Sequence, residues 1–180
     1  MKDIKDFLVE SYKTTKASDL EDLFNKFMRR YKLNEQELEN LFYLVHSDNH
    51  IYKGLKDLIT KIQKNGRIPE IHLYRGCSDK EYKSITETGF SNVETLSFSE
   101  SKEMASGFGN NVVEIIAEVP MFCYHEFLGD YFSSIEVIDP EEFDAADGET
   151  MIETAEEELE WICTNDYKFV PYNGIFKLTK

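Results

Sequence analysis

The chain has 180 residues, about the length of one generous domain. Its composition, with 41% apolar and 13% aromatic residues and only 9 glycines and 4 prolines, excludes a disordered, low-complexity or collagen-like protein. The 35 acidic and 20 basic residues give a net charge of −15. This charge argues against a broad nucleic-acid-binding surface, because such surfaces rest largely on Lys and Arg.

Targeting signals and metal motifs are missing from the sequence. Acidic residues interrupt the N-terminal segment where a signal peptide needs an apolar run, and no run approaches the roughly 18 apolar residues of a membrane span. His46 and His50 could share a helix face, but Ser47 stands where the H-E-x-x-H zinc motif needs Glu. We therefore expect a cytoplasmic protein without a membrane segment, a signal peptide or a metal site.

The cysteines point to the same compartment. They are Cys77, Cys123 and Cys163. None belongs to a CxxC pair, and an odd, sparse count is typical of a reducing environment rather than of a disulfide framework.

Apolar residues in the first third of the chain recur at helical spacing and predict amphipathic helices. The three stripes are Leu20, Leu23, Phe24, Phe27 and Met28; Leu38, Leu41, Phe42 and Val45; and Leu55, Leu58, Ile59 and Ile62. Asn34 and Glu37 predict a capping box at the start of the second helix, and Asn65-Gly66 with Pro69 predicts the end of the third. A further helix is expected over residues 3–15.

The rest of the chain has short apolar runs separated by turns, which predict strands. The expected strands cover residues 71–74, 94–99, 112–119, 157–163 and 167–178. Ser78 and Glu81 predict a capping box for a helix that ends at Gly89, and a short helix is expected through Ala105 and Phe108. We predict an α+β fold. It is expected as a single domain over residues 1–180, with a helical lobe over 1–68 and a strand-rich core over 69–180.

The negative charge is concentrated in one segment. Between Glu136 and Glu160 lie twelve of the 35 acidic residues and no Lys or Arg, which leaves 23 acidic against 20 basic residues elsewhere. Such a run usually indicates a solvated acidic loop, and we expect one here.

Arg75 ends the short apolar run Leu73-Tyr74 and is followed by Gly76. A buried guanidinium needs an anion, and its planar fork suits a phosphate, while a glycine lets a ligand approach the backbone. Taken alone, however, an arginine in this place is more often paired with an acidic side chain of the same protein.

Two further features involve serines and carboxylates. Ser97 and Ser99 flank Phe98 at the end of an expected strand, where serines commonly cap helices. Glu158 and Glu160 fall within another expected strand, so period-2 alternation would point both carboxylates to one face. Paired carboxylates are more readily explained by a bound cation or by catalysis than by packing.

The order of these features resembles the R-S-E class of mono-ADP-ribosyltransferases. The motifs that carry the resemblance are LYRG around Arg75, Ser-x-Ser at 97–99 followed by Ala105 and Phe108, the strand EIIAEVP, and ELEW at 158–161. The chain is most similar to the small arginine-specific phage enzymes of the T-even type, in which a helical region precedes the Arg strand. One departure is Phe98, where the family usually has Thr.

The resemblance implies an N-terminal helical lobe packed on a mixed two-sheet core, and NAD as the substrate with no metal. It implies that Glu160 stabilises the cation formed when nicotinamide leaves and that Arg75 holds an NAD phosphate. Gly76 would contact the nicotinamide amide, and Ser97 would orient Glu160. Ser99 would support the local structure. Phe108 would belong to the NAD-binding residues, and Glu158 would orient the attacking arginine and help remove its proton.

The resemblance also implies partners. The enzyme would act as a monomer in the cytoplasm of a bacterial host and modify exposed arginines of proteins, with the transcription or translation machinery as targets. In this family the loop before Glu-x-Glu helps to recognise the target, so the acidic residues from Asp139 to Glu157 would attract a basic surface.

Alternatives from other classes stay open. An NAD glycohydrolase would use the same site with water as the acceptor. A glycoside hydrolase also needs two carboxylates, but it leaves Arg75 and the Ser-x-Ser motif unexplained. A non-enzymatic module that docks to a basic partner would need the negative charge but not Glu160 in particular.

Overall fold

The computed structural model describes residues 17–46 and 54–180. The helix expected over residues 3–15 lies outside the described residues, and so does His50 of the expected histidine pair. The chain divides into two compact units. The first unit contains the described residues up to 46 together with 126–156, and the second contains residues 54–125 and 157–180.

The first unit is helical. Its helices are α2 (Ala17–Tyr31), α3 (Glu35–His46), α8 (Pro140–Ala145), and most of α7 (Tyr124–Ile138) and α9 (Gly148–Glu158). The predicted stripes of α2 and α3 are confirmed, since Leu23, Phe27 and Leu41 are buried. The capping box is confirmed as well: Asn34 Oδ1 accepts from Glu37 N at 2.9 Å, and Glu37 Oε2 accepts from Asn34 N at 2.8 Å.

Aromatic rings form the core of this unit. The buried rings belong to Phe27, Tyr31, Phe42, Phe127 and Tyr131. Phe42 and Tyr131 have ring centroids 4.5 Å apart, and Phe27 meets Tyr131 edge-on at 5.1 Å. Rings from α2, α3 and α7 therefore pack together, although α7 lies almost one hundred residues further along the chain.

The expected acidic loop before Glu160 is wrong, because most of that segment is helical. Asp139 and Pro140 begin α8, with proline in the first turn, and α9 continues to Glu158. Phe143 and Met151 are buried, so sparse apolar residues anchor these helices. Most of the acidic side chains of the segment are exposed, although Asp139 at the start of α8 is buried. The many acidic residues of this segment favour the prediction of a loop, although its few apolar residues are spaced as in amphipathic helices.

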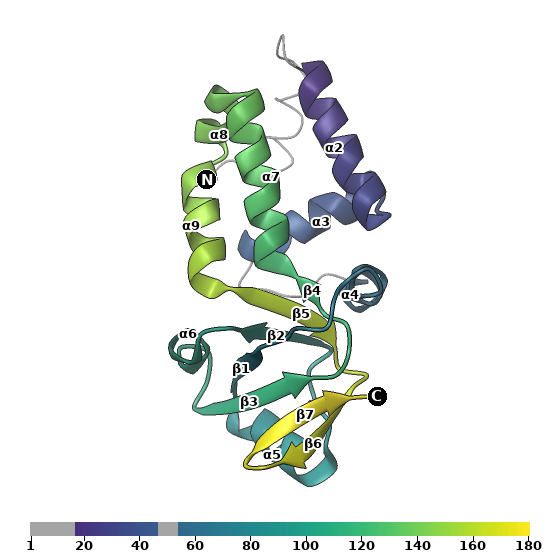
Figure 1. Cartoon of the computed structure of the whole chain (residues 1–180), viewed down its shortest axis with the longest axis vertical. Coiled ribbons are helices and arrows are strands. Elements are labelled where there is room, and N and C mark those ends of the chain that lie inside the picture. The colour runs from purple at the N-terminus through teal and green to yellow at the C-terminus, as the bar shows by residue number, and fades with distance from the viewer. Residues whose placement is uncertain (1–16, 47–53) are drawn as a thin grey trace. The chain divides into compact units, whose positions relative to one another are not determined.

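The second unit is built on one mixed sheet (Figure 1). Its strands are β1 (His72–Cys77), β2 (Thr95–Ser99), β3 (Asn111–Ala117), β4 (Phe122–Cys123), β5 (Glu160–Thr164), β6 (Lys168–Tyr172) and β7 (Ile175–Thr179). Their order is β4-β5-β2-β1-β3-β7-β6, and every pair is antiparallel except β3 with β7. Over the described residues the ladder is continuous, so the strands form a single seven-stranded sheet instead of the expected two.

Three helices accompany this sheet: α4 (Leu55–Gln63), α5 (Asp79–Thr88) and α6 (Lys102–Ser106). As predicted, Ser78 caps α5 by accepting from Glu81 N, and Gly89 ends it in a left-handed conformation. The single strand expected over 167–178 is a hairpin, because Asn173 and Gly174 both have positive φ and form its turn.

Buried apolar side chains from most strands, such as Leu73, Leu96, Phe98, Ile115 and Trp161, form the core of the second unit. Among the residues that the structure describes, no helix is both long and apolar enough to cross a bilayer.

Candidate active site

The strands that carry the three sequence features are neighbours in the sheet. In the strand order, β5 with Glu160 lies beside β2 with Ser97 and Ser99, and β2 lies beside β1 with Arg75. Ser99 is opposite Glu160 in the antiparallel β2–β5 pair. Residues that are 85 positions apart in the chain are thus brought to one region of the second unit.

Ser97 and Glu160 are in direct contact. The Ser97 hydroxyl donates a hydrogen bond to Oε1 of Glu160. Phe98, between the two serines, points to the opposite face, where it is 1% exposed and packs near the ring of Phe169. The unusual Phe98 therefore belongs to the core, and the two serines share the other face.

The carboxyl group of Glu160 is half-buried and its pKa is about 7. Burial raises this pKa most, because a carboxylate loses hydration there. The hydrogen bond from Ser97 lowers it, the negative charge of Glu158 raises it, and the positive charge of Arg75 lowers it. Neutral pH thus falls within the range in which this group titrates.

Glu158 does not lie on the strand, so the expected pairing of Glu158 and Glu160 on one strand face is wrong. Glu158 is the last residue of α9, and β5 begins at Glu160. Leu159 between them has φ of 45°, a left-handed conformation that ends the helix and turns the chain into the sheet. The Glu158 side chain is half-buried, and burial, then the charge of Glu157, raises its pKa.

Ser99 secures the junction between α9 and β5. Its hydroxyl donates to the carbonyl oxygen of Glu158 at 2.7 Å and accepts from the backbone N–H of Ser101 at 2.9 Å. The residue is 7% exposed. Its contacts are therefore structural, and they hold the helix end next to the first turn of α6.

Arg75 is paired with an acidic side chain of the same unit. Its Nε and Nη2 donate to the two carboxylate oxygens of Glu81 at 2.9 and 3.2 Å, and its Nη1 donates to the carbonyl oxygen of Ser97 at 2.8 Å. The side chains of Arg75 and Glu81 are 13% and 5% exposed. These bonds occupy three of the five guanidinium N–H groups and leave one on each terminal nitrogen.

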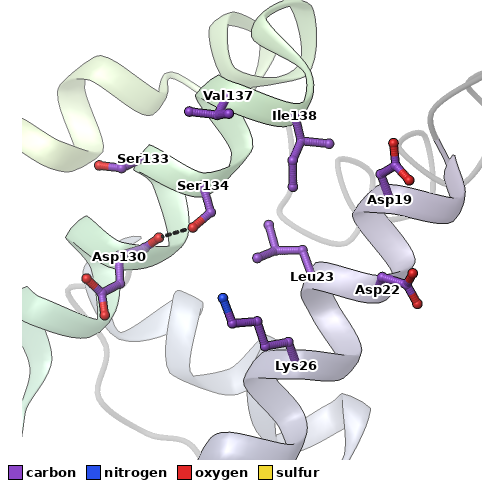
Figure 2. Close-up of a pocket in the computed structure, with 9 residues that line it drawn as sticks. All are labelled: Asp19, Asp22, Leu23, Lys26, Asp130, Ser133, Ser134, Val137 and Ile138. Atoms are coloured by element: carbon purple, nitrogen blue, oxygen red, sulfur yellow. Dashed lines mark hydrogen bonds between the residues drawn. The ribbon is translucent and has the colours of Figure 1, made fainter.

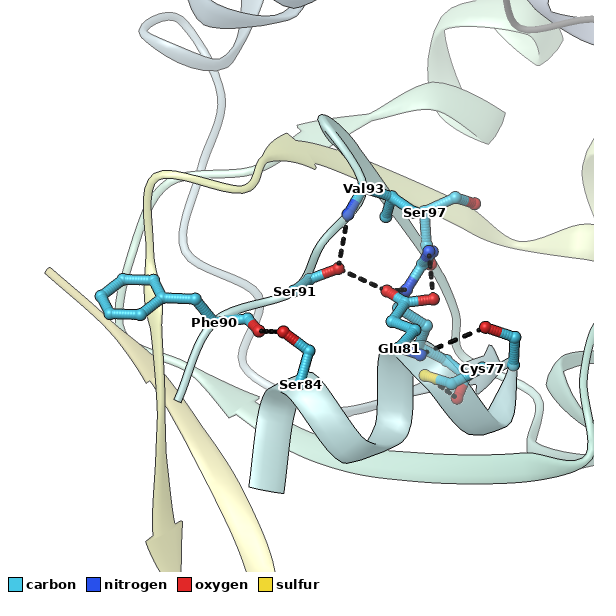
Figure 3. A network of polar contacts seen from close by, with 9 residues as sticks. Cys77, Glu81, Ser84, Phe90, Ser91, Val93 and Ser97 are labelled. Carbon is cyan, nitrogen blue, oxygen red and sulfur yellow. Dashed lines mark hydrogen bonds and ion pairs between the residues drawn. The ribbon is translucent and has the colours of Figure 1, made fainter. Parts of the chain in front are cut away.

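The Glu81 carboxylate has a further partner, as Figure 3 shows. The Ser91 hydroxyl donates to its Oε1 at 2.6 Å and accepts from the backbone N–H of Val93 at 3.2 Å. Sequence reasoning assigned Glu81 only to a capping box and did not single out Ser91. The Ser78-x-x-Glu81 spacing predicts that the Glu81 side chain reaches back to the backbone of Ser78, but this side chain binds Arg75 instead. No other sequence signal indicates the network.

Gly76 is a glycine because α6 approaches β1 closely. A Cβ atom there would overlap the carbonyl oxygen of Ala105. The loop after α6 packs in the same way, since a Cβ at Gly109 would overlap the backbone of Cys77. Phe108 in this loop is 66% exposed. The close approach explains Gly76 without a ligand, so its contact with nicotinamide remains a prediction.

Other polar groups hold the backbone of Glu160. Its carbonyl oxygen is 3.2 Å from Nδ1 of His125, and the ring of His125 also contacts the Cys123 thiol, with 3.6 Å between Sγ and each ring nitrogen. The neighbouring Trp161 donates from Nε1 to Glu100 at 2.8 Å. Contacts on the Glu160 carbonyl oxygen and on the neighbouring Trp161 side chain therefore hold this part of β5.

A separate cavity of about 580 Å³ lies in the first unit, where α2 and α7 line it (Figure 2). Its lining residues are Asp19, Asp22, Leu23, Lys26, Asp130, Ser133, Ser134, Val137 and Ile138. It contains none of the residues that the sequence marks as functional.

We compared the chain with models of known protein families and with curated proteins, and neither comparison gave a match.

Proposed function

We propose that the chain is an NAD-dependent mono-ADP-ribosyltransferase, which transfers ADP-ribose to arginine side chains of a protein and releases nicotinamide. The observation that carries the proposal is the hydrogen bond from Ser97 to Glu160 across adjacent strands, with Arg75 on the next strand. This juxtaposition fits the R-S-E resemblance of the sequence.

The chemistry requires a carboxylate beside the ribose. When the bond between the ribose C1′ and the nicotinamide nitrogen breaks, the electron pair leaves with nicotinamide and positive charge develops on the ribose. Glu160 in its ionised form would stabilise that charge, and the Ser97 hydroxyl would hold the carboxylate in place. The positive charge of Arg75 favours the ionised form, because it lowers the pKa of Glu160.

The attacking group would be a guanidinium nitrogen of the target. It forms the new bond to C1′, and its proton passes to a base. Glu158 is suited to this task, because a half-buried carboxylate with a raised pKa accepts a proton more readily than an exposed one. Its place at the end of α9 puts it on a different element from Glu160.

Arg75 would have two tasks in this proposal. Its bond to the Ser97 carbonyl supports the serine. Its two remaining N–H groups would bind a phosphate oxygen of NAD. The proposed targets are proteins of a bacterial host, including those of transcription or translation.

The test is incubation of the purified chain with labelled NAD and a bacterial lysate, followed by mass spectrometry of the modified side chains. We expect ADP-ribose on arginines with the wild-type chain and none with Glu160→Gln. Glu94→Gln, at an exposed acidic residue beside β2, is the matched control and should behave like the wild type.

The other outcomes discriminate between functions. Cleavage of NAD without labelled protein would identify an NAD glycohydrolase. Label on a residue other than arginine would overturn the acceptor, and undiminished NAD cleavage by Glu160→Gln would overturn the whole assignment.

A further inference from the structure

Glu81 is 4% exposed, and the roles proposed above give it no task. Its carboxylate accepts two hydrogen bonds from Arg75 and one from Ser91. Two parallel bonds to a guanidinium fork fix the plane of that group, and the third bond fixes the carboxylate itself. Glu81 is therefore held rigidly, and it holds Arg75.

The guanidinium of Arg75, held in this way, also binds the backbone of β2. Backbone pairing between β1 and β2 is short, with Tyr74 opposite Ser99. The bond from Arg75 Nη1 to the carbonyl oxygen of Ser97 is a side-chain tie between the two strands. The serine whose carbonyl is held in this way is the one whose hydroxyl donates to Glu160.

We propose that Glu81 is a positioning residue of this site, which holds Arg75 against the Ser97 carbonyl and thereby keeps the Ser97 hydroxyl on Glu160. Apolar side chains of similar volume often replace a buried ion pair without loss of stability. We therefore attribute the Arg75–Glu81 pair to the position that it gives the guanidinium against the Ser97 carbonyl oxygen. A catalytic role for Glu160 rests on the proposed function, but the chain of hydrogen bonds needs no ligand.

The first test measures the pKa of the Glu160 carboxyl by carbon NMR in the full-length chain, with and without Glu81→Gln. The groups that act on this carboxyl are Ser97 from β2, Arg75 from β1 and Glu158 from the end of α9. Glu81→Gln should raise the pKa, because it loosens Arg75 and Ser97, which both lower it.

The sign of the change decides the outcome. If Arg75 kept its place without Glu81, removal of a nearby negative charge would leave the Glu160 pKa unchanged or lower it. Either result would overturn the proposal. Glu87→Gln is the matched control on the same helix, since Glu87 is exposed and 3.8 Å from Lys83, and it should leave the pKa of Glu160 unchanged.

A second set of variants guards against loss of folding, because Glu81→Gln leaves a buried guanidinium without a carboxylate. Arg75→Gln is compared with the double variant Arg75→Gln/Glu81→Gln. If Glu81 acts through Arg75, the Glu160 pKa of the double variant is equal to or below that of Arg75→Gln, because only the direct effect of the Glu81 charge remains. A higher pKa in the double variant would show a route that does not pass through Arg75 and would contradict the proposal.

Kinetics extend the test to the proposed reaction. Glu81→Gln should reduce kcat for NAD cleavage on the order of 10- to 100-fold, as small misplacements of catalytic groups do, and Glu81→Asp should restore part of the loss. The limb of the pH profile that reports Glu160 should move to higher pH. A fall in kcat without that shift would indicate a merely structural role. If the wild type cleaves no NAD, the proposed function fails while the NMR result still decides the role of Glu81.

Discussion

At the scale of single residues, Glu160 combines a charge that the proposed reaction needs with a place that disfavours charge. Its pKa is raised from 4.5 to about 7, so the folded protein binds a proton in this pH range that the unfolded chain has lost. The contribution of Glu160 to the stability of the fold should therefore fall as the pH rises from 4.5 through 7, and it should level off about one pH unit above that folded-state pKa.

This dependence can be measured with Glu160→Gln, which removes it. The variant should be more stable than the wild type at pH 8, by on the order of 2 kcal/mol for a half-buried carboxyl, and the gap should close toward pH 4.5. Denaturant unfolding at both pH values is the measurement. A gap that does not depend on pH would show that Glu160 titrates normally.

Glu158 should separate transfer from hydrolysis. Glu158→Gln removes the proposed base for the attacking arginine but leaves Glu160 ionisable, so transfer to arginine should fall by about 100-fold or more while NAD hydrolysis persists. Parallel assays of labelled protein and of free nicotinamide check this expectation. Equal loss in both assays would contradict the role given to Glu158.

At the scale of elements, the close contact of α6 with β1 requires glycine at position 76, because any side chain there would overlap the backbone of α6. Gly76→Ala would drive a methyl group into the carbonyl of Ala105, so we expect a loss of about 2–3 kcal/mol in the free energy of unfolding. Gly129→Ala in α7 is the control, because a Cβ there meets nothing within 4 Å. An alanine inside a helix should stabilise by about 0.5–1 kcal/mol. Thermal unfolding of both variants tests the contrast.

Elements with a strong apolar period could be predicted from the sequence, and elements dominated by another signal could not. The stripes of α2 and α3 and the caps at Asn34 and Ser78 are local features, and they fold as their spacing indicates. Helices α8 and α9 could not be predicted, because they have few buried apolar residues and many acidic ones. The expectation of a single strand over residues 167–178 is wrong, although Asn173-Gly174 is a strong turn signal for the β6–β7 hairpin.

The site shows the same division. The strands with Arg75, Ser97 and Glu160 are neighbours in the sheet, as the order of the motifs in the sequence suggests. The end of α9 at Glu158 could not be predicted, because it depends on the left-handed backbone of Leu159. A non-glycine residue with positive φ has no reliable sequence signal. The partner of Arg75 could not be chosen either, because many carboxylates are available in the sequence and tertiary packing selects Glu81.

At the scale of the whole molecule, negative charge and the proposed site belong largely to different units. All the acidic residues from Glu136 to Glu156 lie in the first unit, whereas Arg75, Ser97 and Glu160 lie in the second. Under the proposed function, the helical segment would attract a basic target and the sheet would carry the residues that cleave NAD.

The division predicts different responses to salt. Transfer to a protein target should weaken steeply between low and physiological ionic strength, because attraction between exposed charges is screened over about 8–10 Å. NAD hydrolysis by the same preparation should change little. Both rates are measured across a salt series, and a transfer rate that is indifferent to salt would contradict target attraction by the acidic helices.

The burial of Arg75 has a consequence for self-modification. An enzyme that attaches ADP-ribose to guanidinium groups carries substrates in its own chain, and here the four arginines differ sharply in access. Arg29, Arg30 and Arg67 are exposed, whereas Arg75 is 13% exposed and holds Glu81 with two of its three nitrogens. A guanidinium held in this way is a poor nucleophile toward a sugar. Under the proposed function we therefore expect Arg75 to stay unmodified even in a chain that has labelled its other three arginines.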